Sequence, residues 1–208
     1  MRKEQMTAAT DMQSLFVADK KLGELEALFA CEISDDDDFY DVLAYNLTRL
    51  EPRYFLDKLG SYQGSRLRGA VFGLGHSTDR GNEQKGALAA LLYHPDPLIV
   101  GEAIDALRRS EHLDLWQQVG TLIGHAAAPV RGAAARFARK ALLPEEAFLV
   151  LTGLLDDADP LVRQNAIDEL AELGNRRAID AIRPFLQDPE EDVRLAAASA
   201  INALSSQP

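Results

Sequence analysis

The chain has 208 residues, of which 47% are hydrophobic, and carries a formal net charge of −11 at pH 7. It can bury a sizeable core, but its acidity argues against a nucleic-acid backbone as the main ligand, because proteins that bind phosphates usually display a basic surface. The single cysteine, Cys31, excludes an intramolecular disulfide, and we expect a soluble, cytoplasmic protein without a membrane span because no apolar stretch follows Met1.

The charge is unevenly distributed along the chain. Residues 1–60 carry 7 basic and 13 acidic side chains, residues 61–140 carry 10 and 7, and residues 141–208 carry 5 and 13. The two ends are therefore acidic and the middle is mildly basic. Acidic ends would speed the encounter with a basic partner through long-range attraction.

The first sixty residues show helical spacing without a clear repeat. Apolar positions over residues 9–31 predict an opening helix, or a pair of helices broken near Gly23. Four aspartates, Asp35 to Asp38, follow Ser34 and could begin a helix or bind calcium. We favour a helix start, because the run lacks the alternating ligands, central glycine and late glutamate of a calcium loop.

Apolar residues from Phe39 to Leu50 then predict a helix, and Pro52 predicts the start of a partner helix that runs to Leu59. Residues 60–65 read as a loop, and residues 67–92 as the next pair of helices. This pair contains several glycines, which lower helix propensity, so we expect flexibility there. These glycines are Gly73, Gly75, Gly81 and Gly86.

From Asp96 onward one short pattern recurs every 31 or 32 residues. Val162-Arg163 returns 31 residues later as Val193-Arg194, and Val130-Arg131 precedes it by 32. The segment that begins Asp96-Pro97-Leu98 matches the segment that begins Asp159-Pro160-Leu161 at an offset of 63, which is two repeats.

Each copy contains two apolar series with spacings of three and four, which predict two amphipathic helices. Aspartate before proline marks a helix start, as at Asp159-Pro160 and Asp188-Pro189, and Gly174 can end a helix in the left-handed conformation. Two short helices cannot bury both apolar faces alone, so neighbouring copies must stack. The sequence therefore predicts an all-α fold, a right-handed α-solenoid of antiparallel helix pairs.

We expect residues 1–208 to form a single domain. Its parts are a divergent N-terminal cap and repeat (1–64), four repeats (65–95, 96–127, 128–158 and 159–187) and a C-terminal half repeat (188–208).

The run from Asp157 to Gly174 resembles the HEAT-like repeat of the phycobilisome-lyase type. The resemblance covers residues 96–204 and extends less strongly over 65–95. It implies a buried polar ladder between neighbouring repeats, with a structural role for Asp157, Asp159, Arg163, Asp188 and Arg194. Val100 occupies the arginine position of its repeat, so the ladder should be interrupted there.

The resemblance also implies that second helices line the concave surface, where Trp116, the only tryptophan, would lie. An exposed tryptophan in a groove is a frequent binding hot spot, but Trp116 could also pack between helices. The candidate partner-binding residues, taken from second-helix positions, are Lys85, Trp116, Gln117, Thr121, Phe148, Thr152, Asp180 and Arg183.

His94 and His125 occupy equivalent repeat positions, 31 residues apart. Neighbouring helices lie roughly 8–10 Å apart, too far for a shared metal without long rotamers and a third ligand, so we expect both rings to complement a helix C-terminus. We expect no cofactor, metal or catalytic residue. The chain has no phosphate loop or nucleophile elbow, and it has only Glu111-His112 where HEAT-like iron hydroxylases have His-Glu.

Three classes of function fit these features. We favour a non-enzymatic protein-binding module, such as an immunity-type inhibitor or adaptor for a basic protein. The second class is a tetrapyrrole (bilin) lyase or chaperone-like factor. The third is a helical-repeat DNA glycosylase, which only Trp116 and the basic middle section favour. The oligomeric state stays open.

Overall fold

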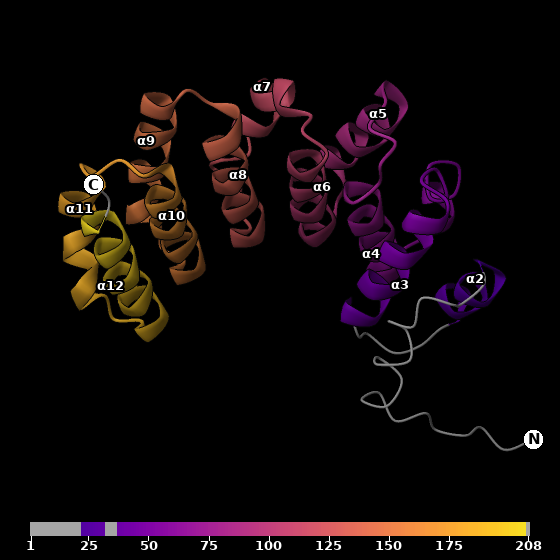
Figure 1. Cartoon of the computed structure of the whole chain (residues 1–208), viewed down its shortest axis with the longest axis horizontal. Coiled ribbons are helices and arrows are strands. Elements are labelled where there is room, and N and C mark those ends of the chain that lie inside the picture. Colours follow the sequence, from indigo (N-terminus) through magenta and orange to yellow (C-terminus); the bar gives the residue numbers. More distant parts are fainter. Residues whose placement is uncertain (1–21, 32–36, 207–208) are drawn as a thin grey trace, which may run out of the picture. The chain divides into compact units, whose positions relative to one another are not determined.

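The computed structural model describes residues 22–31 and 37–206 (Figure 1). Within these ranges the chain forms eleven α-helices, five short 3-10 helices and no β-strand, so the predicted all-α fold is confirmed. None of the described helices is long and apolar enough to cross a membrane. The chain divides into two compact units: unit 1, residues 1–88, and unit 2, residues 89–208.

Unit 1 contains α2 (Leu22–Ala30), α3 (Asp37–Leu50), η1 (Leu59–Ser61), α4 (Gly64–Gly75) and most of α5 (Asn82–Ala90). Helices α3 and α4 pack side by side, and α2 packs on α3. The helices predicted from Phe39 to Leu50 and from Leu67 to Leu74 are thus confirmed.

Of two further predictions in unit 1, one is wrong and one is not tested by the described residues. Helix α2 begins at Leu22, next to Gly23, and the residues before it lie outside the described ranges, so a break near Gly23 stays a prediction. No α-helix begins at Pro52, because the N–H groups of Tyr54 and Leu56 donate to carbonyls three residues earlier, and only η1 follows. The rest of the predicted opening helix, residues 9–21, and Ser34 to Asp36 of the acidic run lie outside the described residues, while α3 begins at Asp37.

Aromatic rings fill the core of unit 1. The ring of Phe29 has its centroid 5.5 Å from Tyr40, 5.1 Å from Phe55 and 5.2 Å from Tyr62. Phe29 and Phe55 are fully buried. The turns after α3 therefore carry Phe55 and Tyr62 onto α2, which explains why this segment is not a regular helix.

Two glycines allow α4 to approach α3 closely. A Cβ atom on Gly69 would lie 2.7 Å from the Cβ of Tyr40 and 3.0 Å from its carbonyl carbon. A Cβ on Gly73 would lie 2.8 Å from the Thr48 hydroxyl and 2.9 Å from a ring carbon of Phe55. Gly73, which we had associated with flexibility, thus has a packing role, and flexibility stays a prediction.

In unit 2 each repeat pairs a long first helix with a shorter second helix. The first helices are α6 (Pro97–Arg109), α8 (Ala128–Ala141), α10 (Pro160–Leu173) and α12 (Glu191–Ser205). The second helices are α7 (Trp116–Gly120), α9 (Pro144–Gly153) and α11 (Ala178–Ile182). The 3-10 helices are η2 (Leu91–Tyr93), η3 (Leu113–Leu115), η4 (Leu154–Asp156) and η5 (Arg183–Gln187). Neighbouring first helices pack directly on one another (Figure 1).

The helix boundaries of unit 2 follow the predicted signals with one exception. Asp96 and Asp159 cap α6 and α10 by accepting the N–H of the second residue that follows, at 2.9 and 3.0 Å. Gly174 ends α10 with a φ of 73°. We predicted that Asp188 and Pro189 start the last helix, but α12 begins at Glu191. The Asp188 side chain instead accepts hydrogen bonds from Arg163.

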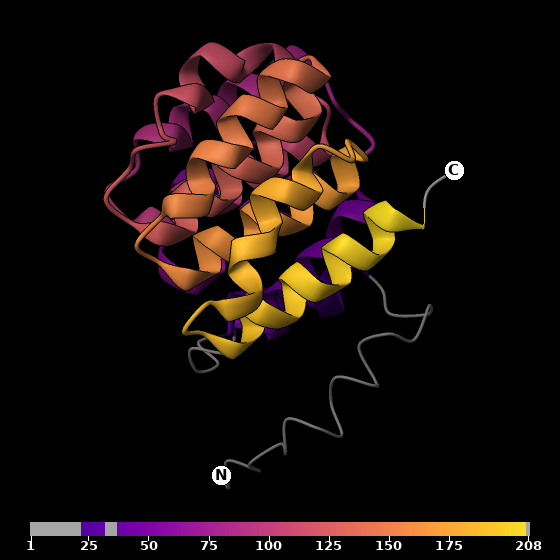
Figure 2. The same ribbon diagram turned by 90° about the vertical axis from the view of Figure 1, so that its left-hand side faces the viewer.

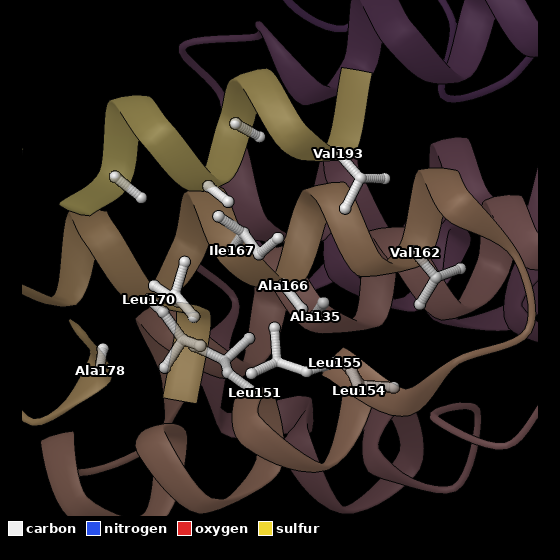
Figure 3. Packing of buried hydrophobic residues seen from close by; sticks show 14 of the residues in the cluster. Ala135, Leu151, Leu154, Leu155, Val162, Ala166, Ile167, Leu170, Ala178 and Val193 are labelled. Carbon is white, nitrogen blue, oxygen red and sulfur yellow. The ribbon is translucent and has the colours of Figure 1, made fainter. Parts of the chain in front are cut away.

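The core of the C-terminal repeats is aliphatic. Figure 3 shows Val162, Ala166 and Leu170 of α10 between Leu151 of α9 and Val193 of α12. All five side chains are fully buried. The apolar series that predicted the helices thus forms the contact between repeats.

Candidate functional site

Four equivalent residues join the repeats of unit 2. These joint residues are His94, His125, Asp157 and Asp188. Each donates its backbone N–H to the carbonyl three residues earlier, at the end of the second helix or its 3-10 turn. Each side chain accepts the backbone N–H two residues later, at 2.8 to 3.1 Å. The same turn is built four times, twice around an imidazole and twice around a carboxylate.

The two joint aspartates also bind an arginine of the preceding first helix. The Arg131 guanidinium donates to both oxygens of Asp157 at 2.7 Å, and Arg163 donates to both oxygens of Asp188 at 2.9 and 2.7 Å. These paired hydrogen bonds hold the pKa of each aspartate below its usual range. Arg163 thus reaches Asp188 of the next repeat. Arg131 also donates to the carbonyls of His125 and Ala126 in the preceding repeat at 2.7 and 2.9 Å, so the predicted ladder between repeats is confirmed.

Two other predicted ladder residues act within their own repeat. Asp159 caps α10, and Arg194 donates to the carbonyl oxygens of Asp188 and Pro189 at 2.7 and 2.8 Å. Both are structural, as expected, but neither side chain bridges two helix pairs.

The ladder is interrupted at Val100, as predicted. Val100 is buried, and the joint residue that an arginine there would reach is His125 instead of aspartate. Both members of the ion pair are thus replaced together. His94 and His125 follow the ends of their second helices and 3-10 turns, as expected, and each accepts a backbone N–H through Nδ1. Among the described residues no three ligating side chains gather around a metal site.

A second polar row crosses the first helices and was not predicted. Arg136 of α8 donates to both oxygens of Asp105 on α6, at 3.1 and 2.5 Å, and to the Asn165 side chain on α10 at 2.9 Å. Burial acts to raise the pKa of Asp105, but the bond and charge of Arg136 lower it overall. The sequence shows charged side chains at offsets of about one repeat. It does not show toward which neighbouring helix each side chain points.

Further arginines of the basic middle section belong to this row. Arg109 pairs with Glu102, and Arg139 pairs with Glu169 of the next first helix. Burial raises the pKa of Glu169, because its contact with Arg139 only partly offsets desolvation. The first helices thus use their arginines to hold the repeats together.

Seven of the eight candidate partner-binding residues lie on or directly after the second helices of unit 2. On α7, Trp116 is half-buried with its indole over Gly120, where an added Cβ would lie 3.2 Å from the ring. Gln117 and Thr121 are exposed. Trp116 therefore combines packing on its own helix with partial exposure.

On α9 the candidate residues are less exposed. Phe148 is only 8% exposed, and the Arg177 guanidinium lies 4.9 Å from its ring centroid. Arg177 also donates to both carboxylate oxygens of Glu145 at 3.0 Å. Thr152 is half-buried and donates its hydroxyl to the Phe148 carbonyl.

Leu149, which the sequence reasoning missed, is 67% exposed beside Phe148. It stands 32 residues after Gln117 and 31 before Asp180, so the three residues occupy equivalent repeat positions. The register that selected Gln117 and Asp180 could have found Leu149, but its apolar character pointed to the core.

The remaining candidates lie on two units. Asp180 and Arg183 are exposed and form an ion pair of 3.6 Å over one turn. Lys85 lies on α5 within unit 1 and is half-buried. We define the second-helix face of unit 2 by the residues that reach its surface: Trp116, Gln117, Thr121, Leu149, Asp180 and Arg183.

Comparison with known proteins identifies the repeat class. Residues 147–208 match a family model described as HEAT repeats. No curated protein matches the sequence. The match names HEAT repeats in general and not the phycobilisome-lyase type.

Several solved structures share the fold. An engineered protein from the Northeast Structural Genomics Consortium aligns with a TM-score of 0.56 and 19% identity, covering 90% of this chain and 100% of that chain. A designed armadillo repeat protein aligns with a TM-score of 0.51 and 17% identity, covering 88% and 100%. Another, in complex with the peptide (KR)4, aligns with a TM-score of 0.51 and 18% identity, covering 94% and 98%. Residues 147–208 are therefore similar to HEAT repeats, and the whole chain shares the fold of helical-repeat solenoids.

Proposed function

We propose that the chain is a non-enzymatic binding module that holds a protein partner on the second-helix face of unit 2. The exposure of Leu149 carries this proposal. A single exposed leucine is common on protein surfaces. Leu149, however, lies in one row with Gln117 and Asp180, on helices whose joints are fixed by hydrogen bonds. An apolar residue surrounded by polar ones is the usual arrangement of a binding hot spot.

The charge of this side favours a basic partner. Five carboxylates lie on the second helices and their 3-10 turns: Asp114, Glu145, Glu146, Asp156 and Asp180. Two of them, Glu145 and Asp180, already pair with Arg177 and Arg183, and the side keeps a negative balance. The net charge of −11 would add long-range attraction. A designed armadillo repeat protein of similar fold was solved in complex with the peptide (KR)4, which supports a basic peptide as a ligand that this fold can hold.

The same data favour a protein over a nucleic acid. Arg108, Arg109, Arg131, Arg136 and Arg139 all contact carboxylates in unit 2. An arginine that already shares its charge with a carboxylate contributes less to phosphate binding. We propose a basic protein as the partner, and an immunity-type inhibitor or adaptor as the role.

Affinity capture with matched variants tests the proposal. The wild-type chain, Leu149→Glu and the control Leu161→Glu, which alters an exposed leucine on a first helix, are used as bait in a lysate. We expect a basic protein that binds at low salt, is released at high salt, and is lost only with Leu149→Glu. Equal capture by all three baits, or capture of pigment or nucleic acid instead, would contradict the proposal.

Trp116→Ala measures the share of the tryptophan in binding. We expect affinity for the captured partner to fall about tenfold or more, with little change in melting temperature, because the ring rests on its own helix. A large drop in melting temperature with binding retained would assign Trp116 to the core.

A further inference from the structure

Two neighbouring second helices, α9 and α11, are joined on the second-helix face. The Arg177 guanidinium, at the start of α11, donates to both carboxylate oxygens of Glu145 on α9 at 3.0 Å and lies 4.9 Å from the Phe148 ring centroid. Leu149 follows Phe148 directly, and Asp180 follows Arg177 by one turn. Leu149 and Asp180 occupy equivalent positions on two helices in contact, so they lie about 8–10 Å apart.

Leu149 and Asp180 together present an apolar group and a charge. Leu149 is 67% exposed, and the Asp180 side chain is 91% exposed. Arg183 lies 3.6 Å from the Asp180 carboxylate, but an exposed ion pair within one helix contributes little. A cation of a partner can therefore replace Arg183 beside Asp180. The pair matches a segment that carries an apolar side chain and a cation at the same spacing.

Small residues leave room for a backbone beside this pair. Gly153 follows Leu149 by four residues and Pro184 follows Asp180 by four, so each shares a helix face with the larger side chain. Gly153 is exposed, and a Cβ there would meet nothing within 4 Å. The Thr152 hydroxyl donates to carbonyls of its own helix, at 2.8 and 3.0 Å, so its oxygen is left as an acceptor for an N–H of another chain.

The spacing and the free acceptor favour one backbone conformation for that segment. In a β-strand, side chains on one face repeat at about 6.6–6.8 Å, which is too short. In an α-helix, residues seven apart repeat at about 10.5 Å, but the backbone N–H groups are already bonded within the helix. A polyproline II segment has three residues per turn and a rise of about 3.1 Å, so every third side chain faces the same way at about 9.3 Å. Its N–H groups stay free.

Building on the proposed function, we propose that this part of the second-helix face binds a polyproline II segment of the partner. An apolar side chain of the segment packs on Leu149, and an arginine or lysine three residues away pairs with Asp180. A backbone N–H between them donates to the Thr152 hydroxyl oxygen. The carboxylates of Glu146 and Asp156, on α9 and the 3-10 turn that follows it, add attraction for the cation.

Fluorescence anisotropy with labelled synthetic peptides tests the spacing on the full chain. The probe is a proline-rich peptide of about eight residues with an arginine three residues after its single leucine, made also in reversed order. We expect one of the two to bind with a dissociation constant below about 1 mM. A peptide of the same composition with arginine two residues after leucine, and a helical alanine-rich peptide with the two seven apart, should bind at least fivefold more weakly. No binding in either order, or equal binding of all spacings, would overturn the proposal.

Matched variants locate the bound peptide. Leu149→Glu and Asp180→Lys should each weaken binding at least fivefold, and Asp180→Lys should then prefer a peptide with glutamate in place of arginine. The controls Leu161→Glu and Glu172→Lys alter an exposed leucine and an exposed carboxylate of α10 and should bind like wild type. Since all four residues are exposed, circular dichroism should show the same melting temperature throughout. Binding that neither Leu149→Glu nor Asp180→Lys changes would overturn the proposal.

The peptide experiment and the lysate capture fail in different ways. If Leu149→Glu still abolishes capture of a basic protein while no peptide binds, the face holds a folded surface, and only the polyproline II segment is ruled out. If the peptides bind with the expected spacing while no basic protein is captured, the peptide site stands and the assignment of the partner falls.

Discussion

The helices of units 1 and 2 are held together by different kinds of contact. In unit 1, aromatic rings from α2, α3 and the following turns meet around Phe29, and glycines allow α4 to touch the backbone of α3. In unit 2, alanine and aliphatic side chains form most of the core, together with Phe137 and Phe148. Hydrogen-bonded joints and two rows of arginine contacts connect its repeats.

The difference shows what repetition contributes. In unit 2 each position occurs several times, so replacing one residue can be compared with a natural replacement elsewhere in the same chain. Val100 and His125 together replace the pair formed by Arg163 and Asp188. In unit 1 each contact occurs once, and a change there has no such counterpart.

The largest effect should come from a charge placed in the repeat core of unit 2. Ala166 is fully buried between α10 and its neighbours, so Ala166→Arg would both overfill the core and bury a cation. We expect a loss above about 4 kcal/mol, enough to unfold unit 2. Urea unfolding followed by Trp116 fluorescence checks this, because the only tryptophan lies in unit 2. The control Ala203→Arg, at an exposed position of α12, should unfold like wild type.

The next largest effect should come from breaking one joint. Asp188→Asn keeps an acceptor for the Glu190 N–H but loses the paired bonds to Arg163, so we expect a loss of about 2–3 kcal/mol. The double variant Arg163→Val with Asp188→His copies the natural joint of Val100 and His125. Its loss should be at least about 1 kcal/mol smaller than the sum of the two single losses. Additive losses would show that the pair is not a unit.

The ion pair between Arg163 and Asp188 should also make the stability of unit 2 fall at low pH. Because Arg163 lowers the pKa of Asp188, its contribution is present above the usual aspartate pKa of about 4 and is lost as pH falls through the lower folded value. The stability gap between wild type and Asp188→Asn should therefore narrow below about pH 4. Asp168 and Glu169, whose pKa values are raised by burial, act in the opposite direction but equally in both proteins. A gap that stays constant down to pH 2 would contradict the assignment.

The repeats of unit 2 could be predicted because helix signals lie next to the residues they affect. The Asp159 side chain caps α10 by accepting the N–H of Leu161, two residues later in the sequence, and Gly174 ends the same helix. Asp188 failed as a helix start because its true partners are Arg163, 25 residues earlier, and the Glu190 N–H. Local signals cannot show which distant side chain reaches a carboxylate, and the row from Asp105 to Asn165 was missed for the same reason.

The turns after α3 in unit 1 show a case in which a local helix signal was present but no helix formed. Pro52 is a good first residue for a helix, yet the chain makes turns that carry Tyr54 and Phe55 into the aromatic core. The burial of aromatic side chains there outweighs local propensity. Of the candidate site, the second-helix positions placed Gln117 and Asp180 on the surface. The same positions also selected Phe148, which is buried, and passed over Leu149, which is exposed.

Smaller changes in stability, of opposite sign, should follow when each of two glycines of unit 1 is replaced by alanine. Gly69→Ala places a Cβ against the backbone of Tyr40, so we expect a net loss of about 1–2 kcal/mol after the gain in helix propensity. Gly86→Ala, in α5, meets nothing within 4 Å and should stabilise the chain by up to about 1 kcal/mol. Thermal unfolding of both variants checks the opposite signs. A gain with Gly69→Ala would show that α4 can move away from α3.

The smallest effect should be a loss of stability at alkaline pH that arises in unit 1. Burial, together with the nearby charge of Glu26 for Tyr54 and of Tyr54 for Tyr62, raises the pKa of both phenols to about 12. A raised folded pKa gives stability that is present below the unfolded value of about 10 and is lost as pH rises toward 12. We expect a loss of about 1 kcal/mol per phenol, reduced by solvent screening at the edge of the core.

Absorbance at the tyrosinate band and urea unfolding between pH 9 and about 11.5 measure this alkaline loss. Tyr54→Phe should remove part of the decline, whereas Tyr93→Phe, which changes an 80% exposed phenol of unit 2, should leave it unchanged. If both variants decline like wild type, the alkaline loss comes from other groups and the phenols of unit 1 do not titrate as a buried pair.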